Sequence, residues 1–235
     1  MRIRGRRRCM DCGEEWSYYD TGDVACPTCG SLHSVAAGED RRLHTDAPVD
    51  LDLSEIRADV ETRPLREVAA DAEEAALEYV SARGFVHAGE LQPLDDAMVA
   101  ASQLRHVAAH LGRSIRDPDE VVEAHFLALL AGAPEGERPD DVPEALWGPY
   151  GLALASVVDR YRSETATWLE ERDRPAVIAM ETLRDHMKRV EALDGAVPSA
   201  DADALLAAAR GIGTYLREDD EAALEQAEER LRTLE

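Results

Sequence analysis

The pattern of apolar and polar residues divides the chain into a helical part that begins near residue 65 and a shorter N-terminal part without that pattern. From residue 65 onward, apolar residues recur about every three or four positions, which is the period of one helix face. Val68, Ala72 and Ala76, for example, would share one face of the first helix. The pattern predicts helices over about 65–83 and 94–112, a third after Asp117-Pro118 with Asp117 as its N-cap, a short one between a capping box at Asp141 and a break at Gly148-Pro149, and further helices over about 150–171, 175–193, 200–217 and 220–234.

Three of the predicted turns share a local pattern. Segments that start at Arg113, Thr167 and Thr214 each place an apolar residue two positions later and an aspartate four positions beyond that residue. The aspartate would cap the following helix, because its carboxylate accepts hydrogen bonds from free amides of the first turn. Convergence on favourable turn chemistry and an αα-hairpin repeat both explain the pattern, although starts 54 and 47 residues apart weigh against a strict repeat. We therefore expect a mainly α-helical domain over residues 65–235, either a bundle or an array of αα-hairpins.

All four cysteines lie in the N-terminal part, in two Cys-x-x-Cys-Gly motifs. Cys9 and Cys12 form the first motif, and Cys26 and Cys29 form the second. Each motif is typical of a zinc knuckle, in which a turn directs two thiolates at one point and the following glycine lets the backbone bend. Four thiolates complete a closed tetrahedral shell, so we expect one structural Zn²⁺ ion with no open position for a substrate. Thiol redox chemistry and an iron site are the alternatives for these cysteines.

The residues between the two motifs predict a strand, a turn and a second strand. Residues 16–19 and Val24-Ala25 flank the turn residues 20–23. Trp16 and Tyr18 are two positions apart, so they would share a strand face and form a small core. A module of this size cannot fold on such a core alone, which is a second reason to expect a metal. The domains that we predict are a small β-type zinc ribbon over 1–36, a linker over 37–64 with one short strand or helix near 49–60, and an acidic helical domain over 65–235.

The N-terminal module resembles a known class of zinc ribbons. Its pattern Cys-x-x-Cys-Gly-x-x-Trp-x-Tyr, followed by Cys-Pro-x-Cys-Gly-Ser, is similar to ribbons of the transcription-factor-B (TFIIB) type. The whole chain, with its acidic and almost lysine-free body, resembles uncharacterised haloarchaeal proteins that carry such a ribbon at the N-terminus. The resemblance implies a metal-binding fold but no particular partner, since similar ribbons bind DNA, RNA, polymerases, ribosomes or other proteins. Nothing in the sequence resembles the cyclin-like core of the transcription initiation factors.

Charge is distributed unevenly between the two parts. The chain has 49 acidic residues against 26 lysines and arginines, a net charge of −23, and Lys188 is its only lysine. Residues 1–36 hold five arginines and five acidic residues, so the whole imbalance belongs to residues 37–235. Such acidity suits either a cytoplasm at molar salt or a docking surface for a basic partner. The even spread of acidic residues along the predicted helices favours the halophilic interpretation.

Three features of the helical part are weaker candidates for a site. His106 and His110 stand four positions apart, a spacing that can hold a metal, but the glutamate of a zinc protease is missing and His106 would point to solvent. The segment 84–96 joins two helices, and we expect a structural loop with Phe85 in the core. The basic cluster over 184–189 is spaced to pair with neighbouring acidic residues, which favours a solvated helix face over an anion site.

These features favour a non-catalytic binding or adaptor protein, whose ribbon contacts the gene-expression machinery and whose helical domain contacts a protein partner. A direct nucleic-acid-binding protein is the alternative, and an enzyme with a site around residues 84–110 is the third possibility. No apolar run reaches the about 18–20 residues of a membrane span, so we expect a cytoplasmic protein. The arginines before Cys9 could grip phosphates or dock onto the acidic body. The binding residues that we predict are Arg2, Arg4, Arg6, Arg7, Arg8, Trp16 and Tyr18.

Overall fold

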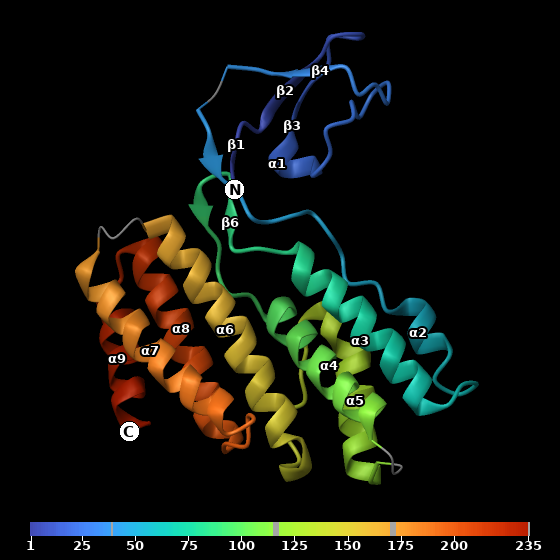
Figure 1. Cartoon of the computed structure of the whole chain (residues 1–235), viewed down its shortest axis with the longest axis vertical. Helices are drawn as coiled ribbons and strands as arrows, with labels where there is room; N and C mark the ends of the chain where they lie inside the picture. Colours follow the sequence, from blue (N-terminus) through green and yellow to red (C-terminus); the bar gives the residue numbers. More distant parts are fainter. Residues whose placement is uncertain (39, 115–117, 170–172, 235) are drawn as a thin grey trace.

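The protein consists of a small β-rich module at one end of its long axis and a larger helical body at the other (Figure 1). This computed structural model describes residues 1–38, 40–114, 118–169 and 173–234. The module contains the four cysteines, and the body contains the long helices. The predicted fold class, a small β region with a cysteine cluster followed by a mainly helical domain, is therefore confirmed.

The module is a three-stranded antiparallel sheet with a short helix at one end. Its elements are β1 (Arg2–Ile3), β2 (Arg6–Cys9), β3 (Glu15–Ser17), α1 (Tyr18–Thr21), β4 (Ser34–Ala36) and β5 (Arg42–Leu43). The sheet has the order β3-β2-β4, so Arg7 on the central strand pairs with Trp16 on one side and with Ala36 on the other. A separate two-stranded ladder joins β1 to β5 and pairs Arg2 with Leu43.

Two details of the predicted ribbon are wrong. Val24-Ala25 forms no strand, and the second partner of β2 is β4, which lies beyond the second cysteine motif. Tyr18 does not continue β3, because the chain turns into helix α1 at that residue and the alternation of strand faces ends. Trp16 is buried, but the second buried aromatic residue is Tyr19, and Tyr18 is half-buried. The Tyr19 ring lies directly on Gly5, where any larger side chain would collide with it.

The body is built of long helices whose bounds follow the apolar periodicity closely. Its elements are α2 (Ser54–Ala58), α3 (Leu65–Ala82), β6 (Val86–His87), β7 (Glu90–Leu91), α4 (Asp96–Arg113), α5 (Glu120–Gly132), α6 (Trp147–Leu169), α7 (Arg174–Ala192), α8 (Ser199–Glu218) and α9 (Glu221–Thr233), with 3-10 turns at Ala133–Glu135 and Glu144–Leu146. The predicted break at Gly148-Pro149 is wrong, because α6 starts before it. A proline in the first turn of a helix has no amide hydrogen bond to lose. The predicted capping box at Asp141 is also absent, since Pro143 is the N-cap of the turn before α6 and makes no side-chain cap bond.

Helices α4, α6 and α8 pack against one another in sequence, and each is followed by a partner helix, α5, α7 or α9, that packs against it (Figure 1). The N-caps of the three partner helices are Asp119, Asp173 and Asp220, the aspartates of the shared turn pattern. Asp173 accepts a hydrogen bond from the amide of Ala176 at 2.9 Å, and Asp220 accepts bonds from two amides, whereas the Asp119 side chain makes no cap bond. Asp117 lies outside the described residues. The described body is thus a row of three αα-hairpins, with α3 packed on α4.

One continuous apolar core runs through the body. Phe85 is buried in it, as expected, and its ring stands edge-on to Tyr161 with 4.9 Å between ring centroids. Leu51 and Leu53, from the segment assigned to a linker, are also buried in this core. Residues 49–60 therefore run along the body, and helix α2 lies where a short element was expected. Among the described residues, no helix is both long enough and apolar enough to cross a bilayer.

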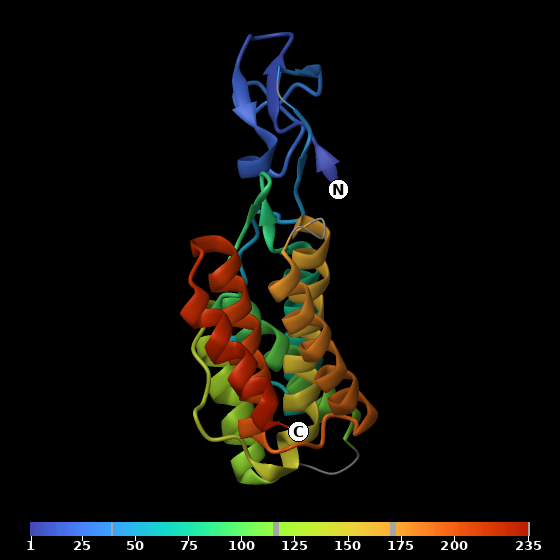
Figure 2. The same ribbon diagram turned by 90° about the vertical axis from the view of Figure 1, so that its left-hand side faces the viewer.

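Main-chain hydrogen bonds and a carboxylate join the module to the body. The β6-β7 hairpin reaches from the body towards the module (Figure 2), and residues 43–46 run beside it. The amide of Gly89 donates to the carbonyl oxygen of Leu43 at 2.8 Å. Glu164 on α6 accepts a hydrogen bond from the hydroxyl of Thr45 at 2.5 Å. The segment that leaves the module is therefore held at several points before it reaches the helices.

Candidate metal centre

The four cysteine side chains converge in the module. Their sulfur atoms all lie within 4.8 Å of one another. The Sγ atoms of Cys9 and Cys29 are 3.6 Å apart, and so are those of Cys12 and Cys26. A tetrahedral zinc ion with Zn–S bonds of about 2.3 Å separates its sulfurs by about 3.8 Å, whereas a disulfide needs about 2.05 Å. The four sulfurs are therefore placed to hold a metal ion, and their spacing is compatible with zinc.

The two motifs share one backbone geometry. In each, the amide of the first cysteine donates to a carbonyl oxygen five residues further on, at 2.8 Å from Cys9 and 2.9 Å from Cys26. In each, the amide of the trailing glycine donates back to the carbonyl oxygen of that cysteine, at 3.2 Å from Gly13 and 2.8 Å from Gly30. These glycines have φ values of +82° and +73°, where a side chain would be strained. The glycine in each motif is thus required by the turn that places the thiols.

The electrostatics of the cluster favour a cation at its centre. The amide of Cys12 donates to Cys9 and lowers the pKa of the Cys9 thiol to about 6. The backbone at Glu14 lowers the pKa of Cys12, but the sulfur of Cys29, burial and the sulfur of Cys26 raise it more, to about 12. Four sulfurs at this separation cannot all ionise unless a cation offsets their mutual repulsion. A bound metal ion supplies that charge, and a fully coordinated one would serve structure instead of catalysis.

One of the predicted binding residues, Arg7, supports the metal centre from the sheet. Arg7 lies opposite Trp16 in the ladder, on the face where Trp16 packs against Cys9 and Cys26. Its guanidinium donates to the hydroxyl of Ser34 from Nε at 3.0 Å and from Nη2 at 2.8 Å. This pair ties the central strand to β4, so Arg7 has a structural contact within the module.

The other arginines divide into two groups. Arg6 and Arg8 alternate with Arg7 and lie on the outer sheet face, where Val35 is the ladder partner of Arg8. Arg6 forms an ion pair with Glu15 at 3.4 Å. The side chains of Arg8 and Arg4 are exposed and make no hydrogen bond or ion pair with another residue that the structure describes. Arg2 lies apart from these side chains, on β1.

Comparison with known proteins places the chain in a family. The model of a family of unknown function, DUF7117, matches residues 1–231. The chain belongs to this family. No curated protein and no solved structure matches it.

In this DUF7117 chain the junction between module and body also brings together polar residues that the sequence did not connect. The rings of His44 and His87 have centroids 5.1 Å apart, and His87 Nε2 lies 3.3 Å from a carboxylate oxygen of Asp20. The amide of Ala88 donates to Nδ1 of His44 at 3.2 Å. The pKa of His44 is lowered, mainly because the ring is buried. His44 and His87 are far apart along the chain, so no local pattern could have paired them.

The expectation that His106 points to solvent is wrong. Its Nε2 atom is buried and has no hydrogen-bond partner among the residues that the structure describes, whereas His110 is exposed. Burial lowers the pKa of His106 to about 4, with further contributions from the charges of Arg105 and Arg113. Within the described ranges, the four cysteines form the cluster of three or more potential metal ligands, and neither histidine belongs to it.

Proposed function

We propose that this protein is a non-catalytic adaptor, that its module is a zinc ribbon of the TFIIB type holding one structural Zn²⁺ ion, and that the ribbon binds a component of the gene-expression machinery. The observation that carries the proposal is the concentration of exposed apolar side chains on the module. Of the nine large hydrophobic residues that are exposed in the described chain, five lie within residues 1–36. Exposed apolar side chains that are concentrated on one small module are typical of a protein that uses the module for interaction.

The arrangement of these side chains fits a contact surface. Met10 and Leu32 are 63% and 72% exposed and belong to the two metal knuckles, which lie side by side because the amide of Met10 donates to the carbonyl oxygen of His33. Val35 is 47% exposed and pairs with Arg8 across the outer sheet face. Apolar side chains form the core of protein interfaces, and methionine and arginine are enriched there.

The charge pattern supports the same assignment. Residues 1–36 have a net charge of zero, whereas the whole chain has a net charge of −23. We propose that the acidic body is adapted to a cytoplasm at molar salt, where short screening lengths make direct contacts more important than long-range attraction. A neutral ribbon with apolar side chains would keep its affinity under these conditions, because burial of apolar surface does not depend on charge.

The test compares two double variants of the full-length protein in affinity purification from the native host. Met10→Ser with Leu32→Ser removes two exposed apolar side chains from the ribbon. Val121→Ser with Ile178→Ser removes two from the body, which are 65% and 51% exposed, and is the matched control. We expect the ribbon variant to lower recovery of transcription or translation components about tenfold, and the control to leave it unchanged. Unchanged recovery with the ribbon variant, at normal metal content, would show that the ribbon is not the docking element.

A second candidate function, direct binding of nucleic acid by the ribbon, is favoured by the guanidinium groups of Arg4 and Arg8, which are exposed and have no partner among the described residues. Binding of short duplex DNA and single-stranded RNA should then weaken when Arg8 is changed to Ser. The slope of the logarithm of the binding constant against the logarithm of the salt concentration should also fall by about one. Arg7→Ser should instead lower the stability of the module through the lost Ser34 contact. Equal affinities of the wild type and Arg8→Ser would refute this function.

A further inference from the structure

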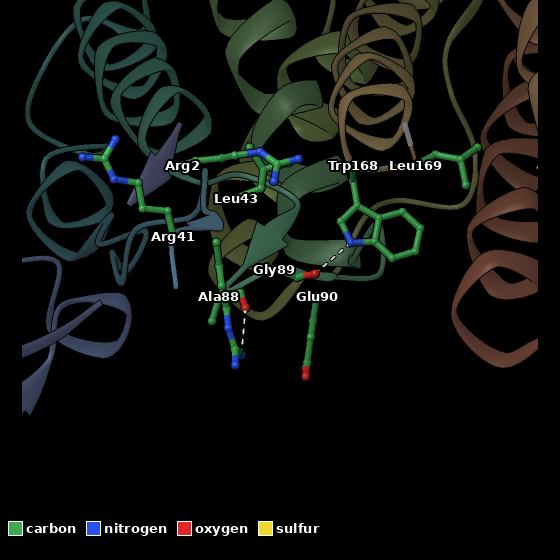
Figure 3. A pocket seen from close by; sticks show the side chains of 9 residues that line it. Arg2, Arg41, Leu43, Ala88, Gly89, Glu90, Trp168 and Leu169 are labelled. Carbon is green, nitrogen blue, oxygen red and sulfur yellow. Dashed lines mark hydrogen bonds between the residues drawn. The ribbon is translucent and has the colours of Figure 1, made fainter. Parts of the chain in front are cut away.

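A pocket of about 490 Å³ opens where the β1-β5 ladder, the β6-β7 hairpin and the end of α6 meet. Figure 3 shows the side chains around it. The ladder contributes two arginines and the residue before β5 a third, the hairpin contributes main chain and one carboxylate, and the helix contributes an indole ring. The residues that carry the argument are Arg2, Arg41, Arg42, Glu90 and Trp168.

The charge of this pocket is opposite to that of the chain. Three arginines and one glutamate line it, in a protein with a net charge of −23. Arg41 has no hydrogen bond or ion pair with any residue that the structure describes. The Arg42 side chain makes one hydrogen bond within the described part of the chain, a long one of 3.4 Å to the carbonyl oxygen of Ala88. By contrast, Arg83 in the body pairs with Asp46 at 2.8 Å and also with Asp95.

Trp168 gives the pocket a flat wall in a fixed orientation. Its Nε1 atom donates to the carbonyl oxygen of Gly89 at 2.8 Å, and this bond is drawn in Figure 3. The ring is half-buried, so it is held by the body and still lines the pocket. A fixed indole ring offers a stacking surface to another planar ring, and guanidinium groups offer forked donors that match phosphate oxygens.

We propose that this pocket binds a nucleoside phosphate, with the base stacked on Trp168 and the phosphate held by Arg42 and by Arg41, whose side chain points away from Trp168 in Figure 3 and would turn towards the ligand. The volume lies within the about 300–1,000 Å³ of small-molecule sites. The pairing of guanidinium groups with an indole ring selects against simpler ligands. A free phosphate would leave the indole without a stacking partner, and a nucleoside would leave the guanidinium groups without an anion. Glu90 is exposed and lines the pocket, and its carboxylate disfavours a second large anionic group on that side. The nucleoside phosphate can be a free nucleotide or the phosphorylated end of an RNA strand.

Titration calorimetry of the full-length protein at molar salt tests the proposal with AMP as the probe. We expect AMP to bind at least about tenfold more tightly than adenosine or inorganic phosphate, since each loses one of the two contacts. Arg41→Ser with Arg42→Ser should weaken AMP binding about tenfold or more. Arg184→Ser is the matched control, because Arg184 is exposed on α7, also lacks a described partner, and lies outside the pocket. A 5′-phosphorylated RNA trinucleotide that binds more tightly than AMP would identify a strand end as the ligand, and a weaker one would identify the free nucleotide.

Two variants of Trp168 keep the test decisive. Trp168→Leu should weaken AMP binding about tenfold, while Trp168→Phe should retain most of it, because phenylalanine still offers a ring for stacking. If the Trp168→Leu variant misfolds, competition between adenosine and AMP for the Trp168→Phe variant tests the same stacking contact. The proposal is overturned if AMP does not bind the wild type, or if it binds the double arginine variant as tightly as the wild type. Failure of the ribbon as a docking element would not affect either result.

Discussion

Replacing His106 by glutamine tests whether one neutral, buried histidine limits the stability of the helical body in acid. Burial lowers its pKa from 6.5 to about 4. The folded protein therefore keeps the ring neutral, while the unfolded chain takes up a proton once the pH falls below about 6.5. This contribution to the free energy of unfolding is complete above about pH 6.5 and is lost as the pH falls towards 4.

The size of the effect follows from the lowered pKa. A fall from 6.5 to about 4 corresponds to about 3 kcal/mol, of which about 2 kcal/mol is lost by pH 5. Glutamine does not take up a proton, so between about pH 7 and 5 the His106→Gln variant should lose about 2 kcal/mol less than the wild type. The assay is urea unfolding of the body at constant molar salt, followed by helical circular dichroism at both pH values.

His110→Gln is the matched control, because His110 is exposed on the same helix. Its stability should fall with pH in parallel with the wild type. The buried histidines His44 and His125, whose pKa values burial also lowers, are present in all three proteins, so their contributions cancel in the comparison. Parallel pH profiles for the wild type and His106→Gln would refute the reasoning.

Elemental analysis should find one zinc ion per chain, and Cys26→Ser should abolish it and unfold the ribbon but not the body, because metal binding supplies on the order of 10 kcal/mol to such modules. Iron in place of zinc, or no metal, would contradict this. Asp173→Ala and Asp220→Ala should each lower the free energy of unfolding by about 1 kcal/mol, and Asp119→Ala by less, since its side chain makes no cap bond; equal losses at the three sites would be inconsistent with the cap geometry. Lowering the salt from molar to about 0.1 M should reduce helicity, because the screening length grows from about 3 Å to about 10 Å, and unchanged melting would favour a basic partner for the acidic surface.

The sequence predicts the helices well because most of them bury one face, so that Val68, Ala72 and Ala76 of α3 are buried as a stripe. It fails for His106 because α4 packs against α3, α5 and α6, and residues 98–104 are all buried. A helix enclosed in this way has no wide solvent face, and periodicity alone cannot reveal the enclosure.

The cysteine spacing predicts the candidate metal centre because the ligands of a knuckle are local in sequence. The rest of the ribbon depends on turns that the pattern does not encode. Tyr19, and not Tyr18, is the buried tyrosine because four residues form a helical turn where a strand was expected, and its ring packs on Gly5 and not in the cluster of Cys9, Trp16 and Cys26. The sequence also could not predict the arginine pocket. Arg41 and Trp168 are far apart along the chain, and they line the same pocket only because the β6-β7 hairpin packs between them.

The bonds that hold residues 43–46 to the β6-β7 hairpin and Thr45 to Glu164 set the direction of the body relative to the ribbon. A partner that grips the ribbon would therefore present the body at a set distance and angle to whatever lies next to it. If the same assembly also touches the body, the second contact forms at high effective concentration without the entropy cost of a loose tether. Thr45→Ala would then leave the affinity for each isolated contact unchanged and weaken only the assembly that engages both.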